Sequence, residues 1–318
     1  MNKITSVKKI GYIPNSHSFI KWCKRAVLSY QLYLLLLPAF VYVLIFNYGP
    51  MYGVQIAFKD FRTSLGIWSS EWVGLKHFIR FIQFPNFWKI IKNTFFISLY
   101  SIATFPCAII LALLINEIGN NIFKRIVQMI TYAPHFISIV VICGMIVLFF
   151  NYSTGIINNF IEFIGFDRVN FLIEPKYFRS IYVWSGVWQE VGWGTIIYLA
   201  ALSGVNLELI EAARIDGASR LQIIRHVNVP SIAPTIIILL ILSCGNVLSV
   251  GFEKVYLLQN PLNLDTSQVI STYVYEVGLR GGQFSYSSAI GLFNTVVNIL
   301  LLLIVNSIAR KVSEVSIW

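Results

Sequence analysis

The sequence EAARIDGASRLQIIRHVNVP, residues 211–230, is a charged segment in an otherwise apolar chain, and it is the most informative part of the chain. Apolar runs lie on both sides of it, one ending near Leu202 and the next beginning near Ile232. Its acidic, arginine and histidine side chains require water, since charges are costly inside a membrane. The Glu-Ala-Ala start, Gly217 and Pro230 predict a short helix, a sharp turn and a second helix that stops at the next span.

The composition of the chain places it in a membrane. Of its 318 residues, 57% are hydrophobic and 12% are charged, whereas soluble domains carry about 25% charged residues. About 20 apolar residues in a helix cross a hydrocarbon core of about 30 Å. Because lipid offers the backbone no hydrogen-bond partner, apolar runs of that length must be helical. We therefore predict an all-α, polytopic membrane protein.

The apolar runs predict six transmembrane helices, with the polar loop between the fourth and the fifth. Their ranges are 27–48, 94–115, 126–150, 180–202, 232–250 and 285–308. The first run is longer than the apolar core of a signal peptide and no small-residue cleavage site follows it, so we expect it to remain as a span. The predicted organisation is a basic tail at 1–26, a membrane domain at 27–310 that contains the loop at 205–230, and a tail at 311–318.

The distribution of basic residues predicts the orientation of the chain. With the N-terminus inside, 13 of the 24 Lys and Arg residues fall in short cytoplasmic segments. The others are spread over three longer external stretches that hold most of the acidic residues. The positive-inside rule therefore predicts that both termini and the 211–230 loop are cytoplasmic.

Several classes of function are disfavoured. The net charge of +10 is scattered over loops without an aromatic platform, which argues against nucleic-acid binding. No phosphate-binding GxxxxGK[ST] loop, HExxH or GxSxG motif occurs. We therefore expect that the chain is not an enzyme and that it binds neither a metal ion nor a cofactor. The cysteines have no metal-site or disulfide spacing and are expected to be small apolar fillers. They are Cys23, Cys107, Cys143 and Cys244.

An external segment, residues 74–92, alternates apolar and basic residues on a roughly helical period. We expect an interfacial helix that lies on the membrane. A role in contacting a partner protein is the alternative for this segment.

Each position of the 211–230 loop has a physical reason. Gly217 supplies a left-handed or strained turn without a steric penalty. Asp216 is placed to accept from backbone donors at the start of the second helix, and Pro230 is suited to begin the next span. Three small side chains let the loop sit close against another surface: Ala212, Ala213 and Ala218.

The loop resembles the EAA signature of permease subunits of binding-protein-dependent ABC importers. That pattern reads Glu-Ala-Ala, three residues, Gly, nine residues, Ile, one residue, Leu-Pro. It falls here on Glu211, Ala212, Ala213, Gly217, Val227, Val229 and Pro230, with Val for Ile and Val for Leu. Further segments resemble the carbohydrate-uptake, maltose permease-like branch, above all its permeases for complex oligosaccharides and polysaccharide fragments. They are residues 33–61, 70–81, 131–141, 187–202, 251–262 and 272–279.

The resemblance implies a coupling helix seated in a groove of a cytoplasmic ATPase. Its coupling residues would be Glu211, Ala212, Ala213, Asp216, Gly217, Ala218 and Pro230. It also implies a second homologous permease subunit, two nucleotide-binding ATPase subunits that hold ATP and magnesium, and an external solute-binding protein that delivers an oligosaccharide. The chain would then be a multi-pass protein of a bacterial cell membrane.

Polar residues inside the spans are candidates for a substrate pathway. Glu190 and Gln189 lie between Trp188 and Trp193 in the fourth span, and sugars are bound by aromatic faces together with carboxylates and amides. A structural Glu, with the tryptophans as an interfacial belt, is the alternative. Asn246 and Asn294 are further candidates, although polar residues in spans also join helices to one another.

Two functions are alternatives to that of an ABC importer permease. One is an ion-coupled secondary sugar transporter or channel that uses Glu190, against which the absence of an internal repeat argues. The other is an intramembrane enzyme acting on lipid-linked sugars, which lacks any catalytic group. The sequence does not decide whether an oligosaccharide substrate is neutral or acidic.

Overall fold

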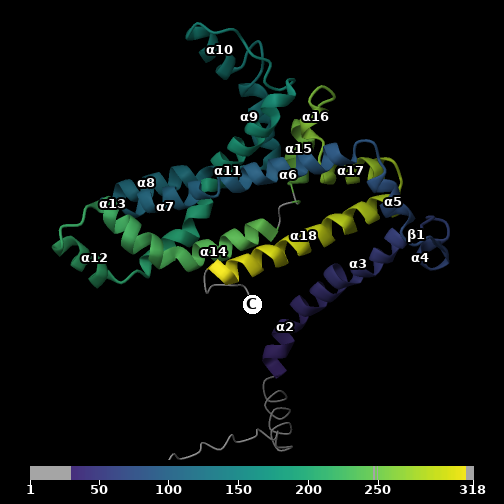
Figure 1. Cartoon of the computed structure of the whole chain (residues 1–318), viewed down its shortest axis with the longest axis horizontal. Helices are drawn as coiled ribbons and strands as arrows, with labels where there is room; N and C mark the ends of the chain where they lie inside the picture. Colours follow the sequence, from purple (N-terminus) through teal and green to yellow (C-terminus); the bar gives the residue numbers. More distant parts are fainter. Residues whose placement is uncertain (1–29, 246–247, 249, 313–318) are drawn as a thin grey trace, which may run out of the picture. The chain divides into compact units, whose positions relative to one another are not determined.

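The computed structural model describes residues 30–245, 248 and 250–312, and these are largely helical, as predicted (Figure 1). The chain divides into two compact units, residues 1–55 and 56–318. Cys23 and the predicted tail at 1–26 lie outside the described residues.

The first span is a long helix that is exposed over most of its length, although Ala57 near its end is buried. It runs from Tyr30 to Phe58 and consists of α2 (Tyr30–Val43), the π-helical turn η1 (Leu44–Tyr48), α3 (Gly49–Met51) and the 3-10 segment η2 (Tyr52–Phe58). It therefore continues beyond its predicted end at residue 48. None of the α2 side chains is buried. A helix that is apolar all round in this way is suited to lipid or to another protein chain.

By length and hydropathy, four helices of the described chain could cross a membrane, or six if each of two bent helix pairs is one span. Six is the predicted number. The second span, Phe87–Asn116, comprises α6 (Phe87–Ala103) and α7 (Pro106–Asn116). The fourth contains α11 (Pro175–Ser203), and the sixth is α18 (Phe284–Val312). Since α18 continues to Val312, the predicted tail at 311–318 begins inside a helix.

The third span is not the single helix expected at 126–150. It is broken into α8 (Asn121–Tyr132) with the 3-10 turn η3 (Ala133–Phe136) and α9 (Ile139–Phe149), which are bent by 98°. Pro134 lies in the break, where proline cannot continue the helical hydrogen bonds. Ser138 then caps α9 by accepting from the Val141 amide at 3.4 Å.

The fifth span begins earlier than expected. The helix that follows the polar loop is continuous from Arg220 to Gly245, through α13 (Arg220–Ile223), the π-helical turn η4 (Ile224–Asn228) and α14 (Val229–Gly245). The prediction that Pro230 begins this span is therefore wrong. Pro230 has no N–H, but its neighbour Val229 bonds to the Ile224 carbonyl in the π-helical turn, and such local adjustments let spans tolerate proline.

Short elements connect the spans. Before the second span lie the antiparallel strands β1 (Lys59–Asp60) and β2 (Glu71–Trp72), with α4 (Gly66–Ser69) and α5 (Lys76–Ile82). Between the third and fourth spans lies α10 (Ile156–Phe163), and α12 (Leu207–Ile215) follows the fourth. Before the sixth lie α15 (Phe252–Leu258), α16 (Leu264–Ser267), α17 (Ile270–Tyr275) and the π-helical turn η5 (Glu276–Arg280).

The segment at 74–92 is held by the protein and does not simply lie on a membrane. Its α5 packs against α18. Phe81 is 1% exposed and joins Phe87, Tyr286 and Ile290 in one buried cluster. The rest of the α5 surface is not covered by the protein, and Ile79 there is about half exposed.

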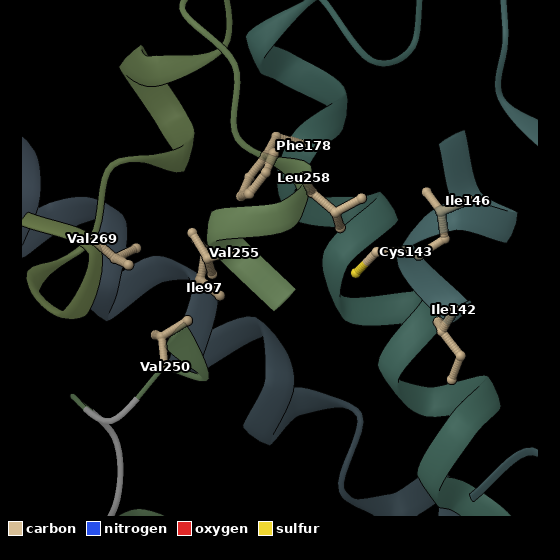
Figure 2. Packing of buried hydrophobic residues seen from close by; sticks show 9 residues of the cluster. All are labelled: Ile97, Ile142, Cys143, Ile146, Phe178, Val250, Val255, Leu258 and Val269. Atoms are coloured by element: carbon tan, nitrogen blue, oxygen red, sulfur yellow. The ribbon is translucent and has the colours of Figure 1, made fainter. Parts of the chain in front are cut away.

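Buried apolar clusters fix α11 and α15 among the spans. Figure 2 shows one cluster, in which Val255 of α15 lies among side chains of α6, α9 and α11. Cys143 belongs to this cluster as a free, buried thiol, as its apolar role predicted. Helix α11 also contacts α7, α8 and α14. The fourth span thus packs against helices of the second, third and fifth spans.

A substitution at Gly192 of α11 tests the packing of α8 on α11. A Cβ atom at Gly192 would lie 1.9 Å from the Thr131 carbonyl oxygen, a backbone atom of α8. We expect Gly192→Ala to destabilise the purified protein by about 2 kcal/mol or more, since overpacking forces backbone shifts. Gly144→Ala is the matched control, because a Cβ there meets no described atom within 4 Å beyond its chain neighbours and the adjacent backbone of its own helix. Equal melting temperatures of the two variants in detergent would contradict this contact.

Candidate functional site

The polar loop folds as a helix with a closed turn. Helix α12 begins after Asn206, whose Oδ1 accepts from the Glu208 amide at 2.9 Å. It ends at Asp216 and Gly217, and Gly217 has a φ of +79°. The Gly217 amide donates to the Arg214 carbonyl at 3.1 Å, and the Ala218 amide to the Ala213 carbonyl at 2.9 Å. This is the Schellman arrangement, which satisfies carbonyls at a helix end and favours glycine.

The helix after the turn is capped by Ser219 and not by Asp216. The Ser219 amide donates to Gln222 Oε1 at 2.7 Å, and the Ser219 hydroxyl accepts from the Gln222 amide at 3.4 Å. This is a capping box at the start of α13. The prediction that Asp216 takes this role is wrong, because Asp216 is the last residue of the preceding helix end.

The surface of α12 is exposed along its length. None of its residues is buried, and Ile215 is 86% exposed. Its base is nevertheless fixed, since Val205 and Ile210 pack into a cluster with Leu202 and Ile232. Exposed apolar side chains on an anchored helix are typical of a surface that contacts another protein.

The predicted coupling residues divide into two groups. Those of the helix and turn lie together, and they are Glu211, Ala212, Ala213, Asp216, Gly217 and Ala218. Pro230 lies apart from them, within the helix of the fifth span and beyond the π-helical turn.

A second candidate site is a cavity of about 1130 Å³ lined by residues of α6, α7, α11, α14 and α15. Glu190 and Gln189 both line it. Serine and threonine side chains contribute further polar groups, among them Ser98, Ser101 and Thr104. The cavity is large enough for a sugar-sized ligand, because small-molecule sites span about 300–1,000 Å³.

Glu190 and Gln189 also hold the break in the third span. Glu190 Oε2 lies 2.9 Å from Nδ1 of His135, and the His135 ring stacks on Trp193 at 4.3 Å between centroids. The Gln189 amide donates to the Ile137 carbonyl at 3.3 Å. Side chains of α11 thus supply polar partners to the break at 133–138. Such partners are needed because, in a membrane, a carbonyl outside a regular helix has no water to bond.

The other predicted pathway residues do not gather at this cavity. Trp188 lines a separate apolar cavity of about 550 Å³ between α9 and α11. Trp193 contacts His135 and is not among the residues that line the larger cavity. Asn294 has a buried Oδ1 that finds no partner among the described residues. Asn246 lies outside the described residues.

Sequence reasoning missed Lys254 and Glu253, which line the larger cavity from α15. Lys254 is 7% exposed, and its Nζ donates to the Tyr182 carbonyl at 2.9 Å. Burial lowers the pKa of Lys254 to about 8, while the neighbouring Cys143 and Glu190 act in the opposite direction. In the sequence, Glu253 and Lys254 appear only as a charged pair soon after an apolar span. A loop in water would have the same pattern, so the pair did not indicate a cavity.

These features define a multi-pass membrane permease. The chain belongs to the family of binding-protein-dependent transport system inner membrane components, whose model matches residues 104–314. The match includes the polar loop and the helices α11, α14 and α15 that line the cavity. The chain is therefore a transport component and not an enzyme.

Two curated relatives align over most of the chain. The polygalacturonan/rhamnogalacturonan transport system permease protein YteP of Bacillus subtilis (strain 168) is 45% identical over 288 residues, which cover 90% of each chain. Protein LplB of the same organism is 44% identical over 296 residues, which cover 93% of each.

Solved structures are similar as well. A chain in the crystal structure of a bacterial ABC transporter involved in the import of the acidic polysaccharide alginate matches with a TM-score of 0.85 and 42% identity, over 92% of this chain and 99% of that chain. A chain of the bacterial alginate ABC transporter in complex with an alginate pentasaccharide-bound periplasmic protein matches with a TM-score of 0.85 and 41% identity.

The left-handed turn at Gly217 yields a graded prediction. Apart from its two chain neighbours, no described residue comes within 4 Å of a Cβ at Gly217, so only backbone strain opposes a side chain there. A residue other than glycine pays about 1–2 kcal/mol in this conformation, and asparagine tolerates it best. We expect transport per assembled complex to fall in the order Gly, Asn, Ala. Gly204→Ala, with a φ of −89°, should transport normally, and equal rates for all four proteins would contradict a need for the turn.

Proposed function

We propose that the chain is the transmembrane subunit of an ATP-driven importer and forms half of a translocation pathway for an oligosaccharide. A second homologous permease completes the pathway, two ATPase subunits bind and hydrolyse ATP on the cytoplasmic side, and an external binding protein delivers the sugar. Both termini and the α12 loop are cytoplasmic in this proposal. This orientation is supported by the positive-inside rule, because Lys and Arg are concentrated in the four segments that it places in the cytoplasm. These segments are residues 1–26, 116–125, 203–231 and 309–318.

The observation that carries the proposal is the exposed but anchored α12. It is continuous in sequence with α11 on one side and, through the Gly217 turn, with the 26-residue helix Arg220–Gly245 on the other. Val205 and Ile210 fix its base in the cluster that contains Leu202 and Ile232. A displacement of α12 by a moving ATPase therefore acts on two helices that line the cavity.

The substrate class follows from the cavity and from the relatives. The cavity offers carboxylate, amide, hydroxyl and ammonium groups, which suit the many hydroxyl groups of a sugar. Two similar proteins are named for the transport of polygalacturonan/rhamnogalacturonan and for the import of the acidic polysaccharide alginate. We propose that this chain serves fragments of an acidic polysaccharide.

Reconstitution of the complete complex in proteoliposomes tests the function. We expect uptake of an acidic oligosaccharide to need ATP on the α12 side and the loaded binding protein, and to persist when ionophores collapse ion gradients. An ion-coupled transporter that uses Glu190 predicts the opposite response to both treatments. Uptake by this chain alone would overturn the proposal.

A bulky residue on α12 tests the contact with the ATPase. Ala212 is exposed, so Ala212→Trp should leave the fold intact and prevent close approach of a partner. We expect the ATPase subunits to be lost on co-purification while the second permease is retained. Asn121→Trp, at an exposed position that begins α8, is the matched control. Retention of the ATPase by both variants would place its contact elsewhere.

A further inference from the structure

Lys254 is a buried cation in the wall of the larger cavity. It belongs to α15, which packs between α6, α9 and α11 in the cluster of Figure 2. Its neighbours Val255 and Leu258 are buried in that cluster, so the backbone that carries the lysine is fixed. The ammonium lies 5.0 Å from the centroid of the Tyr182 ring of α11, within the range of a cation–π contact.

The ammonium has unused hydrogen-bonding capacity. A lysine has three N–H donors, and one donates to the Tyr182 carbonyl at 2.9 Å. Among the described residues, no carboxylate lies within ion-pair distance of it. A buried charge without a counter-ion is costly. Such a group is a candidate for binding an anion that arrives from outside the protein.

A glycine at position 186 leaves space beside this ammonium. Gly186 also lines the cavity, and a Cβ atom there would come to 3.3 Å from Lys254 Nζ. A larger side chain at residue 186 would therefore crowd the charged group. With glycine at this position, no side chain of residue 186 obstructs the ammonium.

Within the part of the chain that the structure describes, no acidic group of the cavity forms an ion pair with Lys254. Glu190 lies next to His135, 2.9 Å from its Nδ1, and Glu253 is exposed. Both carboxylates can accept hydrogen bonds from sugar hydroxyls. With a pKa of about 8, Lys254 remains mostly protonated at neutral pH. The cavity thus presents acceptors for hydroxyl groups and one cation for an acid group.

We propose that Lys254 is the specificity-determining residue of this cavity, and that its ammonium pairs with the carboxylate of a uronic-acid unit during passage. The proposal rests on the proposed function as an oligosaccharide importer. A neutral sugar offers only hydroxyl oxygens to the ammonium, whereas a uronate offers a carboxylate, which adds the attraction of an opposite charge to the hydrogen bond.

The test uses the whole complex in proteoliposomes with its binding protein. Trigalacturonate or trimannuronate is compared with the same trisaccharide after reduction of its carboxyl groups to alcohols, each at a concentration that saturates the binding protein. Lys254→Gln keeps a donor for the Tyr182 carbonyl and removes the charge. We expect the uptake rate of the acidic sugar to fall about tenfold or more, while uptake of the neutral sugar stays within about twofold of the unaltered complex.

Two further variants separate charge from structure. Lys254→Arg keeps the cation and should retain the preference for the acidic sugar. Lys92→Gln removes an exposed lysine of α6 that does not line the cavity, and should behave as the unaltered complex. If Lys254→Gln fails to assemble, the preference of Lys254→Arg decides: its retention supports the proposal and its loss overturns it.

The outcomes distinguish this inference from the function on which it rests. Failure of the unaltered complex to import either acidic sugar overturns the proposed substrate class and, with it, the role of Lys254. Import by the unaltered complex together with an equal rate for Lys254→Gln overturns the role of Lys254 alone. Equal losses for acidic and neutral sugars assign Lys254 a structural role and also overturn the inference.

Discussion

A peptide group in hydrocarbon has no water to bond, and this constraint governs the third span. Its helix breaks at residues 133–138, and the chain turns by 98°. The Ile137 carbonyl there accepts a hydrogen bond from the side-chain amide of Gln189. His135 pairs with Glu190 and stacks on the ring of Trp193. These partners all come from α11. Because a break in a span needs such partners, the position of α11 supports the broken span as well as the wall of the cavity.

The sequence was sufficient for features that depend on composition and on local conformation. Long apolar runs predicted the six candidate spans, since length and hydropathy alone decide whether a helix can cross a membrane. Gly217 was correctly expected in a left-handed turn, because that conformation selects for glycine at a helix end. The same reasoning correctly treated Cys143 as an apolar filler.

Features that depend on neighbours in space could not be predicted in this way. Pro134 and Pro230 look alike in sequence, yet one lies in a break and the other in a continuous helix after a π-helical turn. Which outcome occurs depends on the partners available to the freed carbonyls. Trp188 and Trp193 were grouped by sequence proximity, but at five residues apart they lie on different sides of α11 and reach different surroundings. Lys254 was missed because its burial results from packing of α15 among three distant helices.

The α12 turn is closed by hydrogen bonds of its own. Ala218 bonds to Ala213 across Gly217, and Ser219 and Gln222 bond to each other just beyond it. The loop therefore has its shape before any partner arrives, and little conformational entropy remains to be lost when one binds. A preformed loop of this kind docks as a rigid body. Its affinity for a partner is therefore set by the complementarity of the two surfaces and not by a folding step.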